Sequence, residues 1–161
     1  MDVLIREYTE RDIPEMVEIW NGVVREGNAF PQERSIDREE AAKFFAAQSY
    51  AGVAEMDGEI VGMYILHPNN VERCGHISNA SYAVKAGKRG HRIGEKMVRD
   101  CIEQGKRLGF RILQFNAVVA TNMAAVKLYD KLGFQRLGTI PGGFRMKDGS
   151  YEDIILFYIE L

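Results

Sequence analysis

Arg89-Gly90-His91-Arg92-Ile93-Gly94 connects a predicted strand, His76 to Val84, to a strongly amphipathic predicted helix. The first backbone N–H groups of a helix have no intrahelical partner and lie at the positive end of the helix dipole, so they suit a phosphate or pyrophosphate. The two glycines let such a ligand approach the main chain, and Arg89 and Arg92 supply charge for phosphate oxygens. The hexapeptide therefore predicts an anion-binding turn between a strand and a helix.

Two other phosphate-binding motifs do not match this turn. A nucleotide-hydrolysing P-loop has two glycines separated by four residues and then Lys-Ser/Thr, whereas Gly94 is followed by Glu95 and Lys96, with no hydroxyl for a magnesium ion. A dinucleotide fingerprint has the spacing Gly-x-Gly-x-x-Gly, which does not occur here. For this segment alone, an ordinary helix start with solvated arginines remains an open alternative.

The spacing Arg89-x-x-x-x-Gly94, after a strand that reads Ser81-Tyr82-Ala83-Val84, resembles the acetyl-CoA pyrophosphate loop of the GNAT superfamily of N-acetyltransferases. That family pattern is Gln/Arg-x-x-Gly-x-Gly/Ala, and Arg92 stands at its middle glycine. The resemblance implies acetyl-CoA as cosubstrate, with Arg92 as an added phosphate contact. The implied cofactor-binding residues in this region are Tyr82, Ala83, Val84, Arg89, Gly90, His91, Arg92, Ile93 and Gly94.

A second motif begins at Asn122 and ends at Phe134. It resembles the family signature Asn-x-x-Ala-x-x-Leu-Tyr-x-x-x-Gly-Phe at every named position. The resemblance adds Asn122 to the cofactor-binding residues and makes Tyr129 the general acid that protonates the coenzyme A sulfur. The alternatives are an ordinary amphipathic helix and, for Tyr129, a half-buried packing role.

Acetyl transfer to an amine requires a neutral amine, a stabiliser for the carbonyl oxygen and a proton for the departing thiolate. By resemblance, a backbone N–H near Ala83 or Val84 holds the carbonyl oxygen, at a point where this strand separates from its neighbour. Asn79 and Asn116 are the other catalytic candidates, because their amides can bind an amine, a carboxylate or an oxyanion at any pH. This pair is similar to a GNAT branch, known among fungi, that acetylates proline analogues and related small amines.

The acceptor side is predicted from a loop, Glu26 to Ser35, which contains turn residues and two apolar ones. The substrate-binding candidates are Phe30, Glu33, Asn79 and Asn116. No carboxylate or histidine stands out as a general base: Glu33 is also consistent with a solvated acid, and His76 with a packing residue. No spacing of Cys, His and Asp indicates a metal site.

Length and charge limit the class of protein. The chain has 161 residues, of which 46% are hydrophobic, and this predicts a single N-acetyltransferase domain over residues 1–161. A net charge of −2 with interspersed signs argues against a nucleic-acid partner. Met1 to Arg6 becomes charged at once and no apolar run approaches 18 residues, so we expect a cytoplasmic protein without a membrane span. The two cysteines indicate no disulfide framework, and Cys101 falls at a core position.

The predicted elements alternate between strands and helices in the order β-α-α-β-β-β-α-β-α-β-β. This order implies an α/β (α+β) domain with a mixed, mostly antiparallel sheet flanked by helices. It is also the order of the GNAT fold, whose central strands are splayed. The predicted strands are 3–8, 50–56, 59–66, 76–84, 111–119, 134–140 and 153–161, and the predicted helices are 13–24, a segment after Asp37, 92–108 and 122–132.

The resulting hypothesis is an acetyl-CoA-dependent N-acetyltransferase that transfers acetyl directly to a small-molecule amine in a ternary complex. Two alternatives stay open: a coenzyme A-binding sensor or scaffold without turnover, and a peptide or protein N-acetyltransferase with an open acceptor groove. Two predicted loops, Glu26 to Ser35 and Gly142 to Tyr151, decide between a small and a large acceptor. A homodimer is compatible with the family resemblance.

Overall fold

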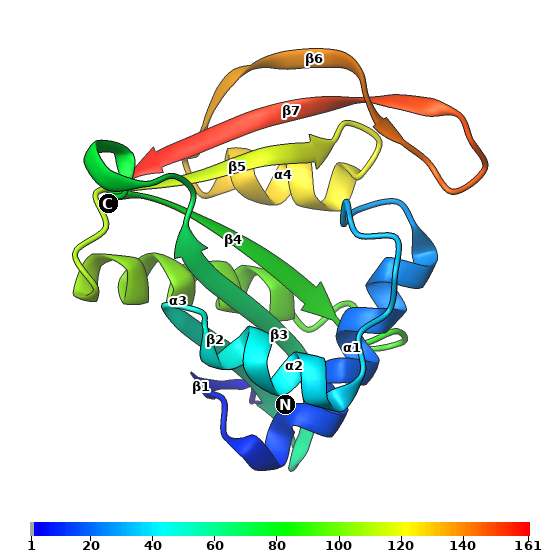
Figure 1. Ribbon diagram of the computed structural model, residues 1–161, viewed down its shortest axis with the longest axis vertical. Coiled ribbons are helices and arrows are strands. Elements are labelled where there is room, and N and C mark those ends of the chain that lie inside the picture. Colours follow the sequence, from blue (N-terminus) through cyan, green and yellow to red (C-terminus); the bar gives the residue numbers. More distant parts are fainter. Residues whose placement is uncertain (1) are drawn as a thin grey trace.

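The computed structural model describes residues 2–161 and contains seven strands, four helices and two short 3-10 turns (Figure 1). Met1 of the predicted domain lies outside the described residues. The predicted order of strands and helices is confirmed. In chain order the elements are β1 (Leu4–Glu7), α1 (Ile13–Glu26), α2 (Arg38–Ala46), β2 (Tyr50–Met56), β3 (Glu59–Pro68), β4 (Ile77–Val84), α3 (Ile93–Arg107), β5 (Ile112–Val119), α4 (Met123–Lys131), β6 (Gln135–Arg145) and β7 (Tyr151–Glu160), with the turns at Glu10–Asp12 and Glu72–Cys74.

The seven strands form one sheet in the order β1-β2-β3-β4-β5-β7-β6. Every neighbouring pair is antiparallel except β4 and β5, which run parallel. These two strands pair only at their first residues, Ile77 with Ile112 and Ser78 with Leu113. Beyond Ser78 they separate, as Figure 1 shows, which confirms the prediction of splayed central strands and leaves a gap in the middle of the sheet.

Helices cover both faces of the sheet. On one face, α1 and α2 bury a cluster that includes Trp20, whose ring lies 4.6 Å from that of Phe30. On the other face, α3 and α4 bury a larger cluster that includes Cys101 and Phe157. Consecutive residues of each central strand therefore face different helices, because side chains alternate along a strand.

Strand β6 is longer than the strand predicted at 134–140. We expected a loop from Gly142 onwards, but β6 continues to Arg145 because a register shift between Ile140 and Phe144 absorbs the Pro-Gly-Gly interruption. A Cβ at Gly143 would lie 2.5 Å from the Ile154 side chain, so any other residue there would force Ile154 to move. The predicted loop is thus a strand end followed by a short turn, and it forms a long hairpin with β7.

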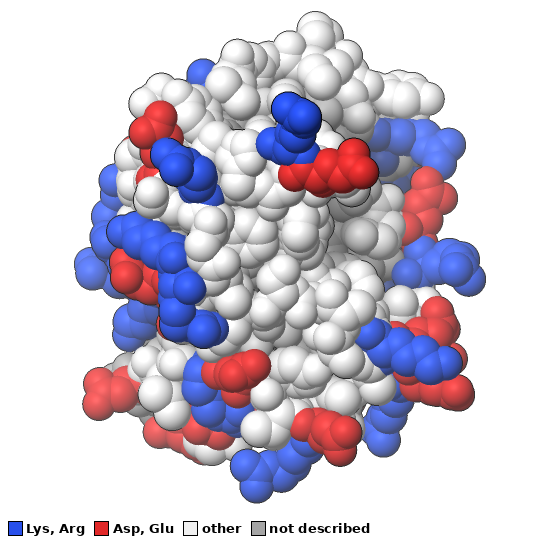
Figure 2. All heavy atoms as spheres, turned by 60° about the vertical axis from the view of Figure 1, so that its left-hand side comes forward, with Lys and Arg blue, Asp and Glu red and all other residues white. Residues whose placement is uncertain are grey.

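Neither the charged side chains nor the two cysteines indicate a single functional site in residues 2–161. On the face shown in Figure 2, basic and acidic side chains are mixed around a broad uncharged area. Cys101 is buried, as expected, and Cys74 is exposed. No described helix is both long and apolar enough to cross a membrane. Among residues 2–161, no group of three or more His, Cys, Asp and Glu side chains is arranged to hold a metal ion.

Candidate functional site

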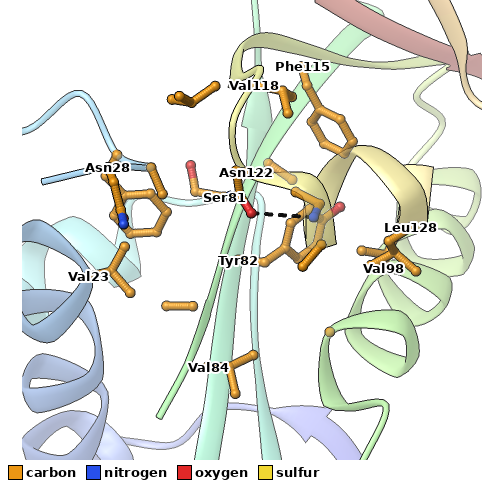
Figure 3. Close-up of a pocket in the computed structure, with 18 of the residues that line it drawn as sticks. Val23, Asn28, Ser81, Tyr82, Val84, Val98, Phe115, Val118, Asn122 and Leu128 are labelled. Carbon is orange, nitrogen blue, oxygen red and sulfur yellow. Dashed lines mark hydrogen bonds between the residues drawn. The ribbon is translucent and has the colours of Figure 1, made fainter. Parts of the chain in front are cut away.

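A cleft of about 1260 Å³ opens where β4 and β5 separate. Figure 3 shows α1 and the α1–α2 loop on one side of β4, and α3 and α4 on the other. Thirteen of the fifteen residues predicted for the site line this cleft, whereas Glu33 and His91 do not. The thirteen are Phe30, Asn79, Tyr82, Ala83, Val84, Arg89, Gly90, Arg92, Ile93, Gly94, Asn116, Asn122 and Tyr129.

The turn between β4 and α3 leaves the first N–H groups of α3 available. Gly90 has φ of +97°, Arg92 has φ of +57°, and the first helical hydrogen bond runs from Lys96 N to Arg92 O. Among the described residues, no side chain caps this end of the helix, and Arg92 occupies the N-cap position. The Arg89 and Arg92 side chains are exposed at the rim of the cleft. Uncapped amides, a helix dipole and two cations together can hold a phosphate-containing ligand.

The backbone conformation of Arg92 explains the glycine in the related pattern. A left-handed conformation costs a residue with a side chain roughly 1–2 kcal/mol, and glycine largely avoids that cost. We expect Arg92→Gly to raise the free energy of unfolding by about 1 kcal/mol in urea titrations of the ligand-free protein. Arg92→Ala is the matched control, because it removes the same charge and keeps the Cβ. Equal stability of the two variants would contradict a backbone origin.

Glu95 places an acid in the first turn of α3, but two cations neutralise it. Lys131 Nζ lies 2.6 Å from one carboxylate oxygen, and Arg99 Nε lies 3.1 Å from the other. The hydrogen bond from Lys131 and that from Arg99 hold the pKa of Glu95 below its ordinary value. The Glu95–Lys131 pair also joins α3 to α4, so the two helices that border the cleft are tied together beside the anion-binding turn.

The main chain of β4 offers free donors to the gap. Lys85 N donates to Val61 O in β3 over 2.8 Å, so the N–H groups of alternate residues in β4 point towards β3. The N–H groups of Val84 and Tyr82 therefore point the opposite way, towards the side from which β5 has withdrawn. Of the two donors that we predicted for a carbonyl oxygen, Val84 rather than Ala83 has the required direction.

The second motif forms α4 by familiar capping rules. Asn122 Oδ1 accepts a hydrogen bond from Ala125 N at 3.4 Å, drawn as the dashed line in Figure 3. Gly133 ends the helix with φ of +89°. Phe134 then stacks on Phe115, with 5.0 Å between the ring centroids. These contacts fix the position of α4 beside the cleft.

Tyr129 projects from α4 into a cluster of aromatic rings. Its ring centroid lies 4.4 Å from that of Phe115 and 5.5 Å from that of Phe157, and only 9% of the residue is exposed. Burial raises the pKa of the Tyr129 hydroxyl above its ordinary value, so the hydroxyl keeps its proton at neutral pH. The residue is therefore rigidly held, lines the cleft and carries a transferable proton.

Asn79 and Asn116 both line the cleft, but they bond to different partners. Asn79 Oδ1 accepts from Ala80 N at 2.8 Å. Asn116 exchanges two hydrogen bonds with Asn69, of 2.6 and 3.2 Å, and accepts a third from Gln114. A register shift of β5 against β7 between Phe115 and Val118 brackets Asn116. Such bulges redirect side chains.

Glu33 lies in the α1–α2 loop, behind the residues that line the cleft. Its carboxylate pairs with Arg145 of β6 over 2.6 Å, with 74% of the Glu33 side chain exposed. A second contact lies close by: a Cβ at Gly27 would come within 2.9 Å of the Lys147 Cβ. The α1–α2 loop and the β6–β7 hairpin thus meet beside the α1 end of the cleft. His91 is exposed on the anion-binding turn.

Several cleft residues were missed by sequence reasoning. Asn28 stands in the loop that we predicted as a wall, and Ser81 belongs to the quoted strand, so both had a local signal. His67 and Met146 line the cleft without any local signal, because β-sheet register brings them there. In Figure 3, Ser81 points towards the α1 side and Tyr82 towards the α3 side, so the cleft can be entered from both faces of the sheet.

Comparison with protein families gives one match that covers most of the chain. Residues 13–134 match the model of the acetyltransferase (GNAT) family. The chain is 26% identical over 144 residues to N-acetyltransferase aca1 of Schizosaccharomyces pombe, covering 79% of this chain and 69% of that protein. It is 24% identical over 169 residues to an L-methionine sulfoximine/L-methionine sulfone acetyltransferase of Pseudomonas paraeruginosa, covering 100% of this chain and 96% of that protein.

Solved structures share the whole fold. A GCN5-related N-acetyltransferase from Kribbella flavida superimposes with a TM-score of 0.91 at 30% identity, covering 99% of this chain and 98% of that one. A phosphinothricin acetyltransferase from Sinorhizobium meliloti, solved in complex with acetyl-CoA, superimposes with a TM-score of 0.92 at 20% identity, covering 100% and 89%. The second likeness concerns the fold alone.

Proposed function

The chain belongs to the acetyltransferase (GNAT) family, and we propose that it transfers the acetyl group of acetyl-CoA directly to the amine of a small molecule, such as an amino acid or a related amine. The observation that carries this proposal is the cleft at the splayed strands, which joins an anion-binding turn to a chamber of mixed polar and apolar residues on the opposite face of the sheet. One substrate can thus enter from each face and meet the other in the gap.

The cofactor side fits coenzyme A by charge and by shape. Arg89, Arg92 and the uncapped amides of α3 bind the pyrophosphate. A Cβ at Gly90 would meet nothing within 4 Å, so the left-handed backbone of the turn, rather than a protein contact, favours glycine there. The open space beside Gly90 lets a ligand approach the main chain. Acetyl-CoA supplies the activated acetyl group when it is bound. The relative from Sinorhizobium meliloti was solved with this molecule.

The reaction needs a hydrogen-bond donor for the carbonyl oxygen and an acid for the sulfur, and both candidates, Val84 and Tyr129, line the cleft. The Val84 N–H stabilises the negative charge that develops on the carbonyl oxygen as the amine attacks. Tyr129 donates its hydroxyl proton to the sulfur as the carbon–sulfur bond breaks, and then regains a proton from solvent. Asn79 and Asn116 orient the acceptor amine on the other side. The net reaction converts a thioester and an ammonium ion into an amide, a thiol and a proton.

A small acceptor is favoured by the wall beside the chamber. The Glu33–Arg145 pair and the contact of Lys147 with Gly27 join the two segments that we expected to form acceptor loops. Phe30 and Met146 supply apolar surface between amides. A peptide would need an open groove through this wall. The name of one sequence relative also indicates a small acceptor, namely methionine sulfoximine or methionine sulfone.

The test is a thiol-release assay with acetyl-CoA and a panel of acceptors. The panel contains proteinogenic amino acids, methionine sulfone, phosphinothricin, proline analogues, polyamines, aminoglycosides and an unstructured hexapeptide with a free N-terminus. We expect at least one small amine to give a kcat/KM at least about a hundredfold above that of the hexapeptide. Mass spectrometry of the product should show one added acetyl group.

Two outcomes would contradict the proposal. A hexapeptide that is the preferred acceptor would indicate a peptide N-acetyltransferase. Tight acetyl-CoA binding in calorimetry without thiol release for any acceptor would indicate a coenzyme A-binding module without turnover. Glu33→Ala provides a matched check on the wall, because removal of its bridge to Arg145 should improve only the larger acceptors.

A further inference from the structure

His67, near the carboxyl end of β3, lies on the acceptor face of the cleft. Ile65 packs into the cluster under α1 and α2, and side chains two residues apart on a strand share a face. His67 is also the register partner of Asn79 in the antiparallel β3–β4 pair. Directly opposed residues have Cβ atoms about 5 Å apart and project on the same side. The imidazole therefore stands beside the Asn79 amide.

A main-chain contact sets the tautomer of this imidazole. His67 Nδ1 lies 3.0 Å from the carbonyl oxygen of Pro68. A carbonyl oxygen only accepts hydrogen bonds, so Nδ1 carries the proton in the neutral ring and donates it to Pro68. Nε2 is then left with its lone pair. This is the arrangement of a histidine that can accept a proton from a substrate.

The other ionisable groups of the cleft suit this role less well. The chain has three histidines, and the other two, His76 and His91, do not line the cleft. Two carboxylates line it, Glu95 and Glu26. Glu95 is bound to two cations at the anion-binding turn. Glu26 is exposed at the end of α1.

We propose that His67 is the general base that deprotonates the acceptor, an inference that rests on the proposed function. His67 Nε2 takes one proton from the ammonium group of the bound acceptor, and the nitrogen lone pair that is released attacks the thioester carbonyl carbon. The imidazolium then passes its proton to solvent through the open side of the cleft. The nitrogen loses its second proton to solvent as the tetrahedral intermediate collapses to the amide and the carbon–sulfur bond breaks. Tyr129 protonates the departing thiolate and regains a proton from solvent, so the base and the acid are different residues on different faces of the sheet.

The other charged and titratable groups that line the cleft come from several elements. They matter because a group in the same cleft can shape the pH dependence of the reaction. They are Glu26 of α1, Lys88, Arg89 and Arg92 of the β4–α3 turn, Glu95 of α3, Tyr82 of β4 and Tyr129 of α4. Glu72, Arg73 and His76 lie in the connection from β3 to β4 and do not line the cleft.

The test compares His67→Asn with His76→Asn, a histidine outside the cleft. The asparagine at 67 retains an N–H near the position of Nδ1 and lacks a base at Nε2. The acceptor is the amine with the highest turnover in the panel above. We expect kcat/KM of His67→Asn to fall about a hundredfold at pH 7, and the loss to shrink to less than about tenfold at pH 9.5, where solution supplies neutral amine.

The controls separate a base from a structural residue. Acetyl-CoA affinity and the melting temperature of His67→Asn should match wild type, and His76→Asn should retain full activity. An equal loss at pH 7 and pH 9.5 would overturn the base assignment, as would an unchanged rate. A pH-dependent loss in Glu26→Gln with none in His67→Asn would assign the base to Glu26 instead. Wild-type protein that acetylates no amine contradicts the proposed function itself, whereas wild-type turnover with an unaffected variant contradicts this inference alone.

Discussion

Tyr129→Phe is expected to lower kcat about a thousandfold while acetyl-CoA affinity stays within twofold of wild type. The substitution removes only the hydroxyl, and the ring keeps its contacts with Phe115 and Phe157. Without a donor, the thiolate must leave unprotonated or take its proton from water, and general acids typically contribute 10²- to 10⁴-fold. Pre-steady-state thiol release and calorimetric titration with acetyl-CoA measure the two quantities.

Tyr50→Phe is the matched control for Tyr129→Phe. Tyr50 is also buried, 7% exposed, on the α3 face of the sheet, but it does not line the cleft. Its substitution should leave kcat unchanged. Because burial raises the pKa of Tyr129, the donor stays protonated from neutral pH to about pH 10, and we expect no loss of activity from its ionisation across that range. An unchanged kcat in Tyr129→Phe would exclude the acid role.

The double substitution Arg89→Gln/Arg92→Gln is expected to weaken acetyl-CoA binding between a hundredfold and a thousandfold at low salt. Each arginine can make a charge-assisted hydrogen bond to the pyrophosphate, worth about 1.5–3 kcal/mol before solvent screening. Both side chains are exposed, so the effect should shrink as ionic strength rises from 0.05 to 0.5 M. Calorimetric titration at several salt concentrations measures the difference.

Lys106→Gln is the matched control for the double variant. It removes one positive charge at the opposite end of α3, where Lys106 pairs with Glu103 over 3.5 Å. We expect its acetyl-CoA affinity to equal that of wild type. A second ligand localises the effect: pantetheine, which lacks the pyrophosphate, should bind wild type and the double variant equally. A loss of affinity for pantetheine as large as that for acetyl-CoA would place the arginines elsewhere.

The parts of the fold that sequence predicted are those with local physical signals. Asp57 and Gly58 both take positive φ, as the predicted two-residue hairpin requires. Asn122 caps α4 and Gly133 ends it, and both roles depend on neighbours within a few residues. The extent of β6 was mispredicted, because a bulge lets a strand continue through Pro-Gly-Gly when the partner strand holds it.

The candidate site shows the same division between features with a local signal and features that depend on distant residues. The anion-binding turn and Tyr129 lie in contiguous motifs, so their positions beside the cleft followed from the chain. Glu33 was expected to contribute to substrate binding, but its carboxylate pairs with Arg145, 112 residues away, and does not line the cleft. His67 reaches Asn79 through the β3–β4 register, which no local pattern specifies. Sequence reasoning thus missed the contacts that depend on strand register or on residues far apart in the chain.

The meeting of the α1–α2 loop with the β6–β7 hairpin has an evolutionary consequence. The two segments contact each other through Glu33 with Arg145 and through Gly27 with Lys147, and they lie outside the two motifs to which we assign donor binding. Under the proposed function, insertions or exchanges in this joined pair would change which amine is accepted while Arg89 to Gly94 and Tyr129 stay intact. A lineage would then keep one donor site and diversify its acceptors by remodelling two surface segments, and a protein engineer would exchange the two segments together.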